Sequence, residues 1–265
     1  MAKESWYSES LARGLLVLRA FGRDAERLRM SEVADRTGLT RAAARRFLLT
    51  LADLGYVGQD GNYFYLRPRI LDLGYAYLSS VRVDQLVEPV LEDIAEKTRA
   101  ASYFAVLDND ETLFVAGVPS PLMASVFMGV GGRIPAYAGS LGKVLLAWLT
   151  QAELDGFLAR SQRVRHTDKT VVEPEALRAR LAEVRAQGYA VNYGEFIEGI
   201  VGVAIPVRNR GGEVVAAINV NRFSPQPLSR EEIEAYVAVL REAVLPIERA
   251  FHASQLRLPA DRPLG

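Results

Sequence analysis

The chain has 265 residues, 49% of them hydrophobic and 24% charged, which suffices for one or two domains with substantial cores. It contains no cysteine, which excludes disulfides and thiolate metal sites, and it lacks an apolar signal core and a membrane-spanning run, so we expect a cytoplasmic protein. The 32 basic and 32 acidic residues cancel overall, but residues 1–83 hold thirteen basic against nine acidic residues, a net charge of +4, and the remainder carries −4.

The first predicted elements are a helix over residues 10–21, where apolar residues recur at helical spacing, and a charged loop over residues 23–29. Two short helices joined by a tight turn are then predicted over residues 31–56. Ser31 is a suitable N-cap for the first of these, Gly38 can end it in a left-handed conformation, and Thr40 can cap the second. The side of the second helix that is predicted to face the core carries Ala44, Phe47, Leu48 and Leu51.

The exposed side of this second helix carries arginines close to its start. Two helices in this arrangement are typical of a helix-turn-helix, whose second helix enters the DNA major groove. Arginine can pair bidentately with guanine, and a small side chain permits close approach to a thymine methyl group. A surface helix with solvated arginines is the alternative. The residues of this helix that we expect to contact double-stranded DNA are Thr40, Arg41, Ala42, Arg45 and Arg46.

A β-hairpin is predicted directly after the second helix, with a strand from Val57, a turn over residues 59–62 and a return strand over residues 63–66. A hairpin at this place is the wing of a winged helix-turn-helix, which favours DNA binding over a solvated surface helix. We expect Gln59 and Asn62, at the tip of the wing, to lie near the minor groove or the DNA backbone. The positive charge of the N-terminal part supplies the attraction to phosphates that such a module needs.

A linker helix that begins at Pro68 is predicted over residues 67–81, and its apolar residues cover more than one face, which indicates packing on a partner. From residue 84 the pattern mixes helices and strands. Helices are predicted over 85–98, within 135–151, and over 173–187 and 230–254. Strands are predicted over 101–107, 112–118, 122–128, 189–192, 202–207 and 213–220. An antiparallel sheet with helices on its faces can enclose a pocket for a small molecule.

Four segments resemble the IclR family of bacterial transcription regulators, in the family's order and at its spacing. They are SEVADRTGLTRAAARRFLLTLADLGYV (31–57), LRPRILDLGYAYL (66–78), PAYAGSLGKVLLAWL (135–149) and EGIVGVAIPVRNRGGEVVAAINV (198–220). The phrases ARGLLVLRAFG, TRAAARRFLLTL and RPRILDLGYAYLSS are most similar to the PcaR/PcaU/PobR-type branch. Members of that branch regulate protocatechuate and 4-hydroxybenzoate catabolism in the β-ketoadipate pathway.

The resemblance implies an α+β fold in three parts. These are a winged helix-turn-helix DNA-binding domain over residues 1–66, a linker helix over 67–83, and a GAF-like mixed α+β effector-binding domain with an antiparallel sheet over 84–265. The resemblance also implies a homodimer or homotetramer on a palindromic double-stranded DNA operator. The implied effector is a small organic acid, commonly an aromatic carboxylate or a β-ketoadipate-like acid, and members either activate or repress.

The resemblance further implies which residues line the effector site. In the family a loop and helix start at residues 138–142 line it, and backbone N–H groups at a helix start suit a carboxylate. Many members carry an aspartate near the position of Tyr193. Many also have a strand that ends in Ser-x-Ser, and this chain has Asn219 and Asn221 there instead. These two residues lie on one face of a strand and can donate to an acid or a hydroxyl. The implied effector-binding residues are Met128, Tyr137, Ala138, Gly139, Ser140, Leu141, Tyr193, Glu195, Asn219 and Asn221.

No catalytic or metal-binding pattern accompanies these features. Residues 129–133 are rich in glycine but match neither a P-loop nor GxGxxG, and the two histidines, His166 and His252, fall short of a catalytic zinc site and are expected at the surface. Ser140 lacks a nearby histidine and a nucleophile elbow, so we interpret it as a helix N-cap. We expect a regulator of an aromatic-acid operon, without enzyme activity, metal or cofactor. A regulator that answers to a glyoxylate-, pyruvate- or sugar-acid-like effector is the alternative, and an enzyme with an accessory helix-turn-helix is a third hypothesis.

Overall fold

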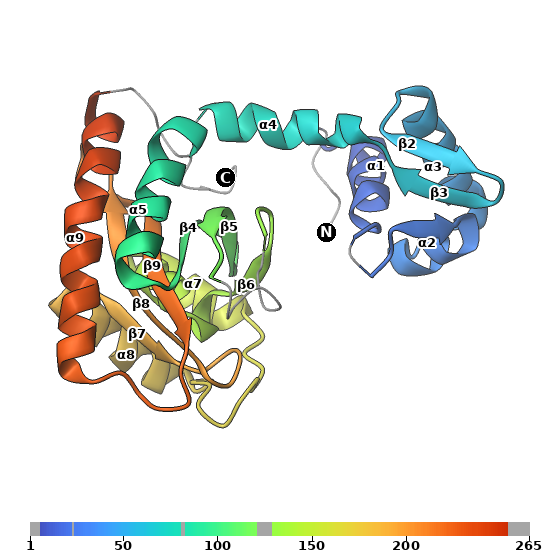
Figure 1. The fold of residues 1–265 in the computed structure, drawn as a ribbon. Coiled ribbons are helices and arrows are strands. Elements are labelled where there is room, and N and C mark those ends of the chain that lie inside the picture. The colour runs from blue at the N-terminus through green and yellow to red at the C-terminus, as the bar shows by residue number, and fades with distance from the viewer. Residues whose placement is uncertain (1–5, 23, 81–82, 121–128, 254–265) are drawn as a thin grey trace. The chain divides into compact units, whose positions relative to one another are not determined.

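The computed structural model describes residues 6–22, 24–80, 83–120 and 129–253, and the chain divides into two compact units between residues 77 and 78 (Figure 1). Each unit has a hydrophobic core of its own. Within the described ranges, no helix combines the length and the apolarity that crossing a membrane requires.

The N-terminal unit packs three helices against a small antiparallel sheet. Its elements are α1 (Glu9–Arg19), β1 (Arg27–Arg29), α2 (Met30–Thr37), α3 (Arg41–Asp53), β2 (Val57–Asp60) and β3 (Tyr63–Leu66). The strand order is β1-β3-β2. The core gathers buried apolar residues from all of these elements, among them Val17, Leu28, Val33, Leu48, Val57 and Phe64. This arrangement confirms the predicted helix-turn-helix and the hairpin that follows it.

The bounds of α2 and α3 agree closely with the sequence prediction. Gly38 ends α2 with a φ of 66°, and Thr40 Oγ1 accepts a hydrogen bond from the Ala43 N–H at the start of α3 (3.2 Å). The predicted N-cap at Ser31 is wrong, because α2 already begins at Met30. The N-cap is Arg29, whose extended backbone continues β1 and whose N–H donates to the Glu32 carboxylate (2.6 Å). The predicted core stripe is confirmed, with four buried residues, Ala44, Phe47, Leu48 and Leu51.

The predicted loop over residues 23–29 is wrong in part, because its last three residues form β1. Leu28 of β1 is buried opposite Phe64 of β3, and the flanking Arg27 and Arg29 are exposed. Three residues are too few to show a period of two, so the local pattern does not distinguish this strand from a charged loop. The strand forms because β3 offers it a partner.

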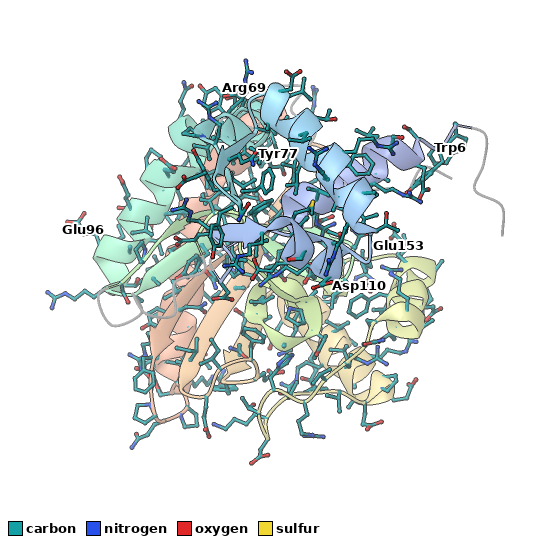
Figure 2. All side chains as sticks on the ribbon, turned by 90° about the vertical axis from the view of Figure 1, so that its right-hand side faces the viewer. Trp6, Arg69, Tyr77, Glu96, Asp110 and Glu153 are labelled. Atoms are coloured by element: carbon teal, nitrogen blue, oxygen red, sulfur yellow. The ribbon has the colours of Figure 1, made fainter. Side chains whose placement is uncertain are left out.

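The linker begins with a 3₁₀ turn, Pro68–Ile70, and continues as α4 (Leu71–Ser80), close to the helix predicted over residues 67–81. Its start is fixed to the end of α3. Arg69, labelled in Figure 2, donates from Nη1 to the carbonyl of Leu54 (2.7 Å). Along α4 the large apolar side chains of Leu71, Leu73 and Tyr75 are exposed.

A six-stranded antiparallel sheet forms the centre of the C-terminal unit, in the order β6-β5-β4-β9-β8-β7 (Figure 1). Its strands are β4 (Ala101–Asp108), β5 (Glu111–Val118), β6 (Arg133–Pro135), β7 (Ala190–Tyr193), β8 (Ile200–Arg208) and β9 (Val214–Phe223). A π-helical turn at Val83–Val87 leads into the first helix of the unit. The helices are α5 (Glu88–Thr98), α6 (Ser140–Ala147), α7 (Gln151–Arg160), α8 (Pro174–Gln187) and α9 (Arg230–Ala253).

Helices cover both faces of this sheet. α5 and α9 lie side by side on one face (Figure 1), and α6 crosses the other face and shares a core with α7 and α8. Tyr103 of β4 belongs to the core on the α6 face. Because successive side chains of a strand point to opposite faces, Asn219 and Asn221 point to one common face of β9, the face of the neighbouring Ala217 in that same core. The predicted mixed α+β fold with an antiparallel sheet is confirmed.

Two elements of this unit were not predicted. Helix α7 starts where the predicted helix over residues 135–151 ends, and its capping box, formed by Thr150 and Glu153, is visible in the sequence as a T-x-x-E signal. Strand β6 has only three residues and, like β1, is too short to show a period. The turn between β4 and β5 is tied to α7 by an ion pair between Arg160 and Asp110 (2.8 Å). Asp110 is labelled in Figure 2. The strand predicted over residues 122–128 lies outside the described residues.

Candidate functional site

The outward face of α3 presents the residues that were predicted to contact DNA. Thr40, Arg41, Ala42, Arg45 and Arg46 are all exposed. The guanidinium carbon of Arg46 lies 5.4 Å from the centre of the neighbouring phenyl ring of Phe47, which holds this arginine against its helix. The face therefore combines three permanent positive charges with a small residue, a composition that suits the major groove.

The wing places Asn62 at the tip of the hairpin, beside Gly61, which has a φ of 55°. Gln59 does not lie at the tip as predicted, because β2 extends through it and pairs it with Phe64. Its amide donates to the carbonyl of Gly61 (2.9 Å), so it braces the tip from the adjoining strand. Behind the tip, Arg29 Nη2 donates to the hydroxyl of Tyr63 (2.8 Å) and stiffens the sheet.

A pocket opens on the α6 face of the sheet in the C-terminal unit. It contains about 560 Å³ of space free of atoms, open solvent at its mouth included. Its wall is formed by strands of the sheet, by the start of α6 and by residues 194–199 between β7 and β8, which we call the strap. The lining residues are uncharged: Tyr103, Phe114, Ile134, Gly139, Ser140, Leu141, Asn192, Phe196, Ile197, Ile200, Asn219 and Asn221.

One wall of the pocket is the first turn of α6. Gly139 is the N-cap, and Ser140 is the first helical residue and only 3% exposed. The interpretation of Ser140 as the N-cap is wrong, because the backbone enters the helix one residue earlier and no side chain caps it. A Cβ on Gly142 would lie 2.1 Å from the carbonyl oxygen of Ala136, so only glycine allows this close packing. The first turn is therefore fixed rigidly beside the pocket.

The opposite wall contains amide side chains of the sheet. Asn219 lines the pocket and is 1% exposed, and its Oδ1 accepts the backbone N–H of Tyr103 (3.0 Å). Its amide nitrogen is the group of this side chain that can donate. Burial raises the pKa of Tyr103 to about 12, so its phenol stays neutral. The Oδ1 atom of Asn221 is buried and has no hydrogen-bond partner in the part of the chain that the structure describes. The wall thus offers neutral polar groups.

The structure brings five of the ten implied effector-binding residues into the pocket wall, and it places four others, Tyr137, Ala138, Tyr193 and Glu195, outside that wall. Tyr137 and Ala138 are buried in the turn before α6, where the Tyr137 hydroxyl bonds to the backbone of Val164. Tyr193 points away because it follows the lining residue Asn192 in β7. Met128 lies outside the described residues. The five in the wall are Gly139, Ser140, Leu141, Asn219 and Asn221.

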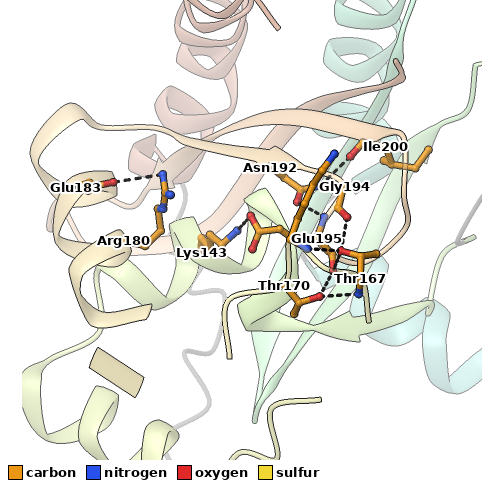
Figure 3. Close-up of polar contacts among 10 residues, drawn as sticks. Lys143, Thr167, Thr170, Arg180, Glu183, Asn192, Gly194, Glu195 and Ile200 are labelled. Carbon is orange, nitrogen blue, oxygen red and sulfur yellow. Dashed lines mark hydrogen bonds and ion pairs between the residues drawn. The ribbon is translucent and has the colours of Figure 1, made fainter. Parts of the chain in front are cut away.

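Glu195, the remaining implied residue, turns away from the pocket and forms a buried ion pair with Lys143 of α6 (Figure 3). Lys143 is 0% exposed and was not singled out from the sequence. Its signal was a single cation in an otherwise apolar and neutral helix segment, SLGKVLLA. Burial lowers the pKa of Lys143, and the carboxylate of Glu195 opposes that shift. The lining residues that were not among the implied ones lie on strands of the sheet or in the strap.

Histidines and acidic residues form no metal site among the described residues, since no group of three possible ligands gathers there. His166 is exposed, as predicted, but it is not merely solvated. Its ring stacks on Tyr137 (6.1 Å between ring centres) and meets the edge of Phe196 (4.8 Å). His166 therefore supports the strap from outside. His252 lies in α9.

Two family models match the chain, the IclR helix-turn-helix domain over residues 10–61 and the bacterial transcriptional regulator IclR C-terminal domain over residues 75–249. The Pca regulon regulatory protein of Pseudomonas putida is 38% identical over 229 residues, which cover 86% of this chain and 78% of that protein. The p-hydroxybenzoate hydroxylase transcriptional activator of Acinetobacter baylyi is 36% identical over 231 residues, 84% of this chain and 85% of that protein. An IclR homolog from Microbacterium hydrocarbonoxydans, solved in complex with 4-hydroxybenzoate, matches with a TM-score of 0.80 at 29% identity, covering 93% of this chain and 100% of that one.

Proposed function

Because the chain belongs to the IclR family of bacterial transcription regulators, we propose that it controls a catabolic operon in response to an aromatic acid of the protocatechuate or 4-hydroxybenzoate type. It acts in the cytoplasm and binds a palindromic operator as a dimer or tetramer, through α3 and the wing. The effector occupies the pocket at the start of α6. The observation that carries this proposal is an uncharged pocket with polar groups on opposite walls, in a fold whose solved relative holds 4-hydroxybenzoate.

The composition of the wall favours an effector with a single negative charge. A carboxylate at the start of α6 would accept the N–H groups of the first turn, which the helix dipole also favours. Among the described residues, those that line the pocket offer no cation to a second carboxylate, and a buried charge without a partner is unfavourable. The amides of Asn219 and Asn221 can bind a neutral hydroxyl group instead. This combination favours a hydroxybenzoate over β-ketoadipate, which carries two carboxylates.

The apolar part of the pocket wall argues against the smallest acids. A glyoxylate- or pyruvate-like acid meets the charge requirement, but it has no apolar body to bury against Phe114, Ile134 and Phe196 of the wall. Burial of apolar surface contributes roughly 25 cal/mol per Å², so an aromatic ring gains far more from this wall than a two- or three-carbon acid does. The aromatic acid is therefore the preferred effector class.

The coupling between effector and operator requires two states with different affinity for the effector, because a ligand shifts an equilibrium only by that difference. We propose that the effector changes the geometry of the assembled regulator through the linker helix α4. The exposed Leu71, Leu73 and Tyr75 of this helix supply an apolar surface on which a second subunit can pack.

The test titrates the full-length protein with a labelled fragment of the regulated promoter and records fluorescence anisotropy with and without each acid of a panel. We expect 4-hydroxybenzoate or protocatechuate to change operator affinity by about tenfold, a coupling within the usual allosteric range, and β-ketoadipate and glyoxylate to change it little. Response only to glyoxylate-, pyruvate- or sugar-acid-like compounds would establish the alternative effector class. Turnover of an aromatic acid by the purified protein would indicate an enzyme.

A further inference from the structure

The buried ion pair between Lys143 and Glu195 belongs neither to the pocket wall nor to the DNA-binding face. The side chain of Lys143 is 0% exposed and that of Glu195 is 9% exposed. Glu195 Oε2 is also buried and has no hydrogen-bond partner within the described residues. An ion pair that is only partly satisfied is often no more stable than a pair of well-packed apolar side chains. Stability alone therefore gives a weak reason for this pair.

The position of Glu195 gives a stronger reason, because this residue fixes the strap from three sides (Figure 3). Its N–H donates to Asn192 Oδ1 (3.1 Å), its carbonyl accepts from Thr170 Oγ1 (2.6 Å), and its carboxylate forms the ion pair. Thr167 Oγ1 adds a hydrogen bond to the carbonyl of Gly194 (2.8 Å). Glu195 thus connects the strap to β7, to the loop before α8 and to α6, and Gly194 adds one further hydrogen bond to that loop.

Glycines bound the strap at both ends. Gly194 and Gly199 each have a φ of 78°, a conformation that glycine adopts readily. These two residues therefore do little to fix the backbone of the strap. The two ends also lie close together, since a Cβ on Gly194 would be 3.2 Å from the nitrogen of Gly199. Between them, Phe196 and Ile197 line the pocket. Outside the pocket, Phe196 also meets His166, and the Gly199 carbonyl accepts the Ser224 N–H (2.7 Å). The contacts of Glu195 are the ones that join this segment to α6.

We propose that Lys143 and Glu195 are positioning residues of the effector site, which hold the strap against α6 so that Phe196 and Ile197 close one wall of the pocket. The proposal rests on the proposed function only in taking this pocket as the effector site. Lys143 lies three residues after Ser140, in the N-terminal half of α6, and the carboxylate would bind at the N-terminus of this helix. The ion pair therefore sets the distance between the carboxylate wall and the apolar wall. It acts through the strap and does not touch the effector.

The test compares the wild-type protein with the double variant Lys143→Met/Glu195→Met, in which side chains of similar length replace both ions. Hydrogen–deuterium exchange is followed by mass spectrometry without ligand. We expect residues 194–200 and the first turn of α6 to exchange about tenfold faster, as for a local opening, while the urea midpoint of unfolding changes little. With 4-hydroxybenzoate as the probe, we expect dissociation to become about tenfold faster, since most changes in affinity fall on the dissociation rate.

The matched control removes another ion pair of the same unit, with the double variant Arg178→Met/Asp155→Met. These two residues join α8 to α7 (2.8 Å), so the control should leave the exchange of the strap unchanged. Unchanged strap exchange in Lys143→Met/Glu195→Met would overturn the proposal. A uniform increase over the whole unit together with lost stability would overturn it as well, since that is the signature of a purely structural pair.

A second variant covers the case in which Lys143→Met/Glu195→Met does not fold. Glu195→Asp keeps the negative charge but withdraws the carboxylate by one methylene from Lys143, and it should show the same local increase in exchange. Wild-type exchange across the strap in Glu195→Asp would overturn the proposal. Failure of 4-hydroxybenzoate to bind the wild-type protein would count against the proposed effector, and the ligand-free exchange comparison would still decide the role of the ion pair.

Discussion

At the scale of the residue, the arginines on the exposed face of α3 carry the proposed contact with DNA. The double variant Arg45→Ala/Arg46→Ala removes two positive charges from this face. Since each lost contact costs roughly 1–3 kcal/mol, we expect operator affinity to fall by about thirtyfold or more and its salt dependence to become shallower, measured by gel-shift titration at several salt concentrations. Arg185→Ala, an exposed arginine of α8, is the control and should bind as wild type does. Undiminished affinity of the double variant would mean that another face contacts the operator.

The second prediction at this scale concerns the donor in the pocket wall. Asn219→Asp preserves the shape of the side chain and an acceptor for the Tyr103 N–H, but it replaces the amide nitrogen by oxygen and adds a negative charge to a wall without cations. We expect the affinity for 4-hydroxybenzoate, measured by calorimetry, to fall by about a hundredfold, because a buried like charge opposes the bound acid.

Asn219→Ser is the companion variant, since serine keeps a hydroxyl donor at the same position. We expect it to lose less than about tenfold in affinity, the value of one modest hydrogen bond. Equal losses in the serine and aspartate variants would show that packing at residue 219, and not its charge and donor, determines binding.

At the scale of the element, the start of α6 depends on a backbone contact. In Gly142→Ala the new Cβ would lie 2.1 Å from the carbonyl oxygen of Ala136, and backbone cannot move aside as a side chain can. We expect urea unfolding to show a loss of about 2 kcal/mol or more, as for overpacking in a tight core. The matched substitution is Gly156→Ala in α7, where the nearest atom is the end of the Arg160 side chain (3.3 Å). It should stabilise the protein by about 0.5–1 kcal/mol, because alanine is the better helix former. Destabilisation of similar size in both variants would contradict this account.

Elements with local signals could be predicted from the sequence, and elements defined by a distant partner could not. Gly38 and Thr40 mark the ends of α2 and α3 by their own backbone and side-chain chemistry, so these helices were placed closely. β1 and β6 are strands only because β3 and β5 pair with them. Helix α7 is different, since the T-x-x-E capping signal at Thr150 and Glu153 marks its start in the sequence itself.

The same distinction applies to the pocket. The resemblance pointed to Gly139, Ser140 and Asn219, which the structure places in the wall, but Asn192 replaces Tyr193 as the lining residue of β7. Side chains one residue apart in a strand point to opposite faces of the sheet. The sequence of a strand of only four residues does not indicate which face meets the pocket. Likewise, nothing local to Glu195 indicates that it pairs with a lysine 52 residues away.

At the scale of the whole molecule, the two units have separate cores, and the chain carries +4 in residues 1–83 and −4 in the remainder. We expect scanning calorimetry to resolve two transitions. A 4-hydroxybenzoate concentration about a hundred times its dissociation constant should add about 2.7 kcal/mol to the C-terminal unit and raise one transition, and operator DNA should raise the other. Asn219→Asp should lose the first response and keep the second. A single transition that moves as a whole with either ligand would show that the units unfold together.

The first turn of α6 offers the pocket donors that belong to the main chain. A substitution can change Asn219 or Asn221 freely, but it leaves the backbone N–H of Leu141 in place unless it introduces proline. On the proposed function, every effector must therefore carry an acid group, because the main chain binds it. The specificity for the rest of the effector depends on side chains of the sheet wall, which substitutions can change. Variants of this pocket should then bind a series of acids that all carry one carboxylate and differ in the groups at the opposite end.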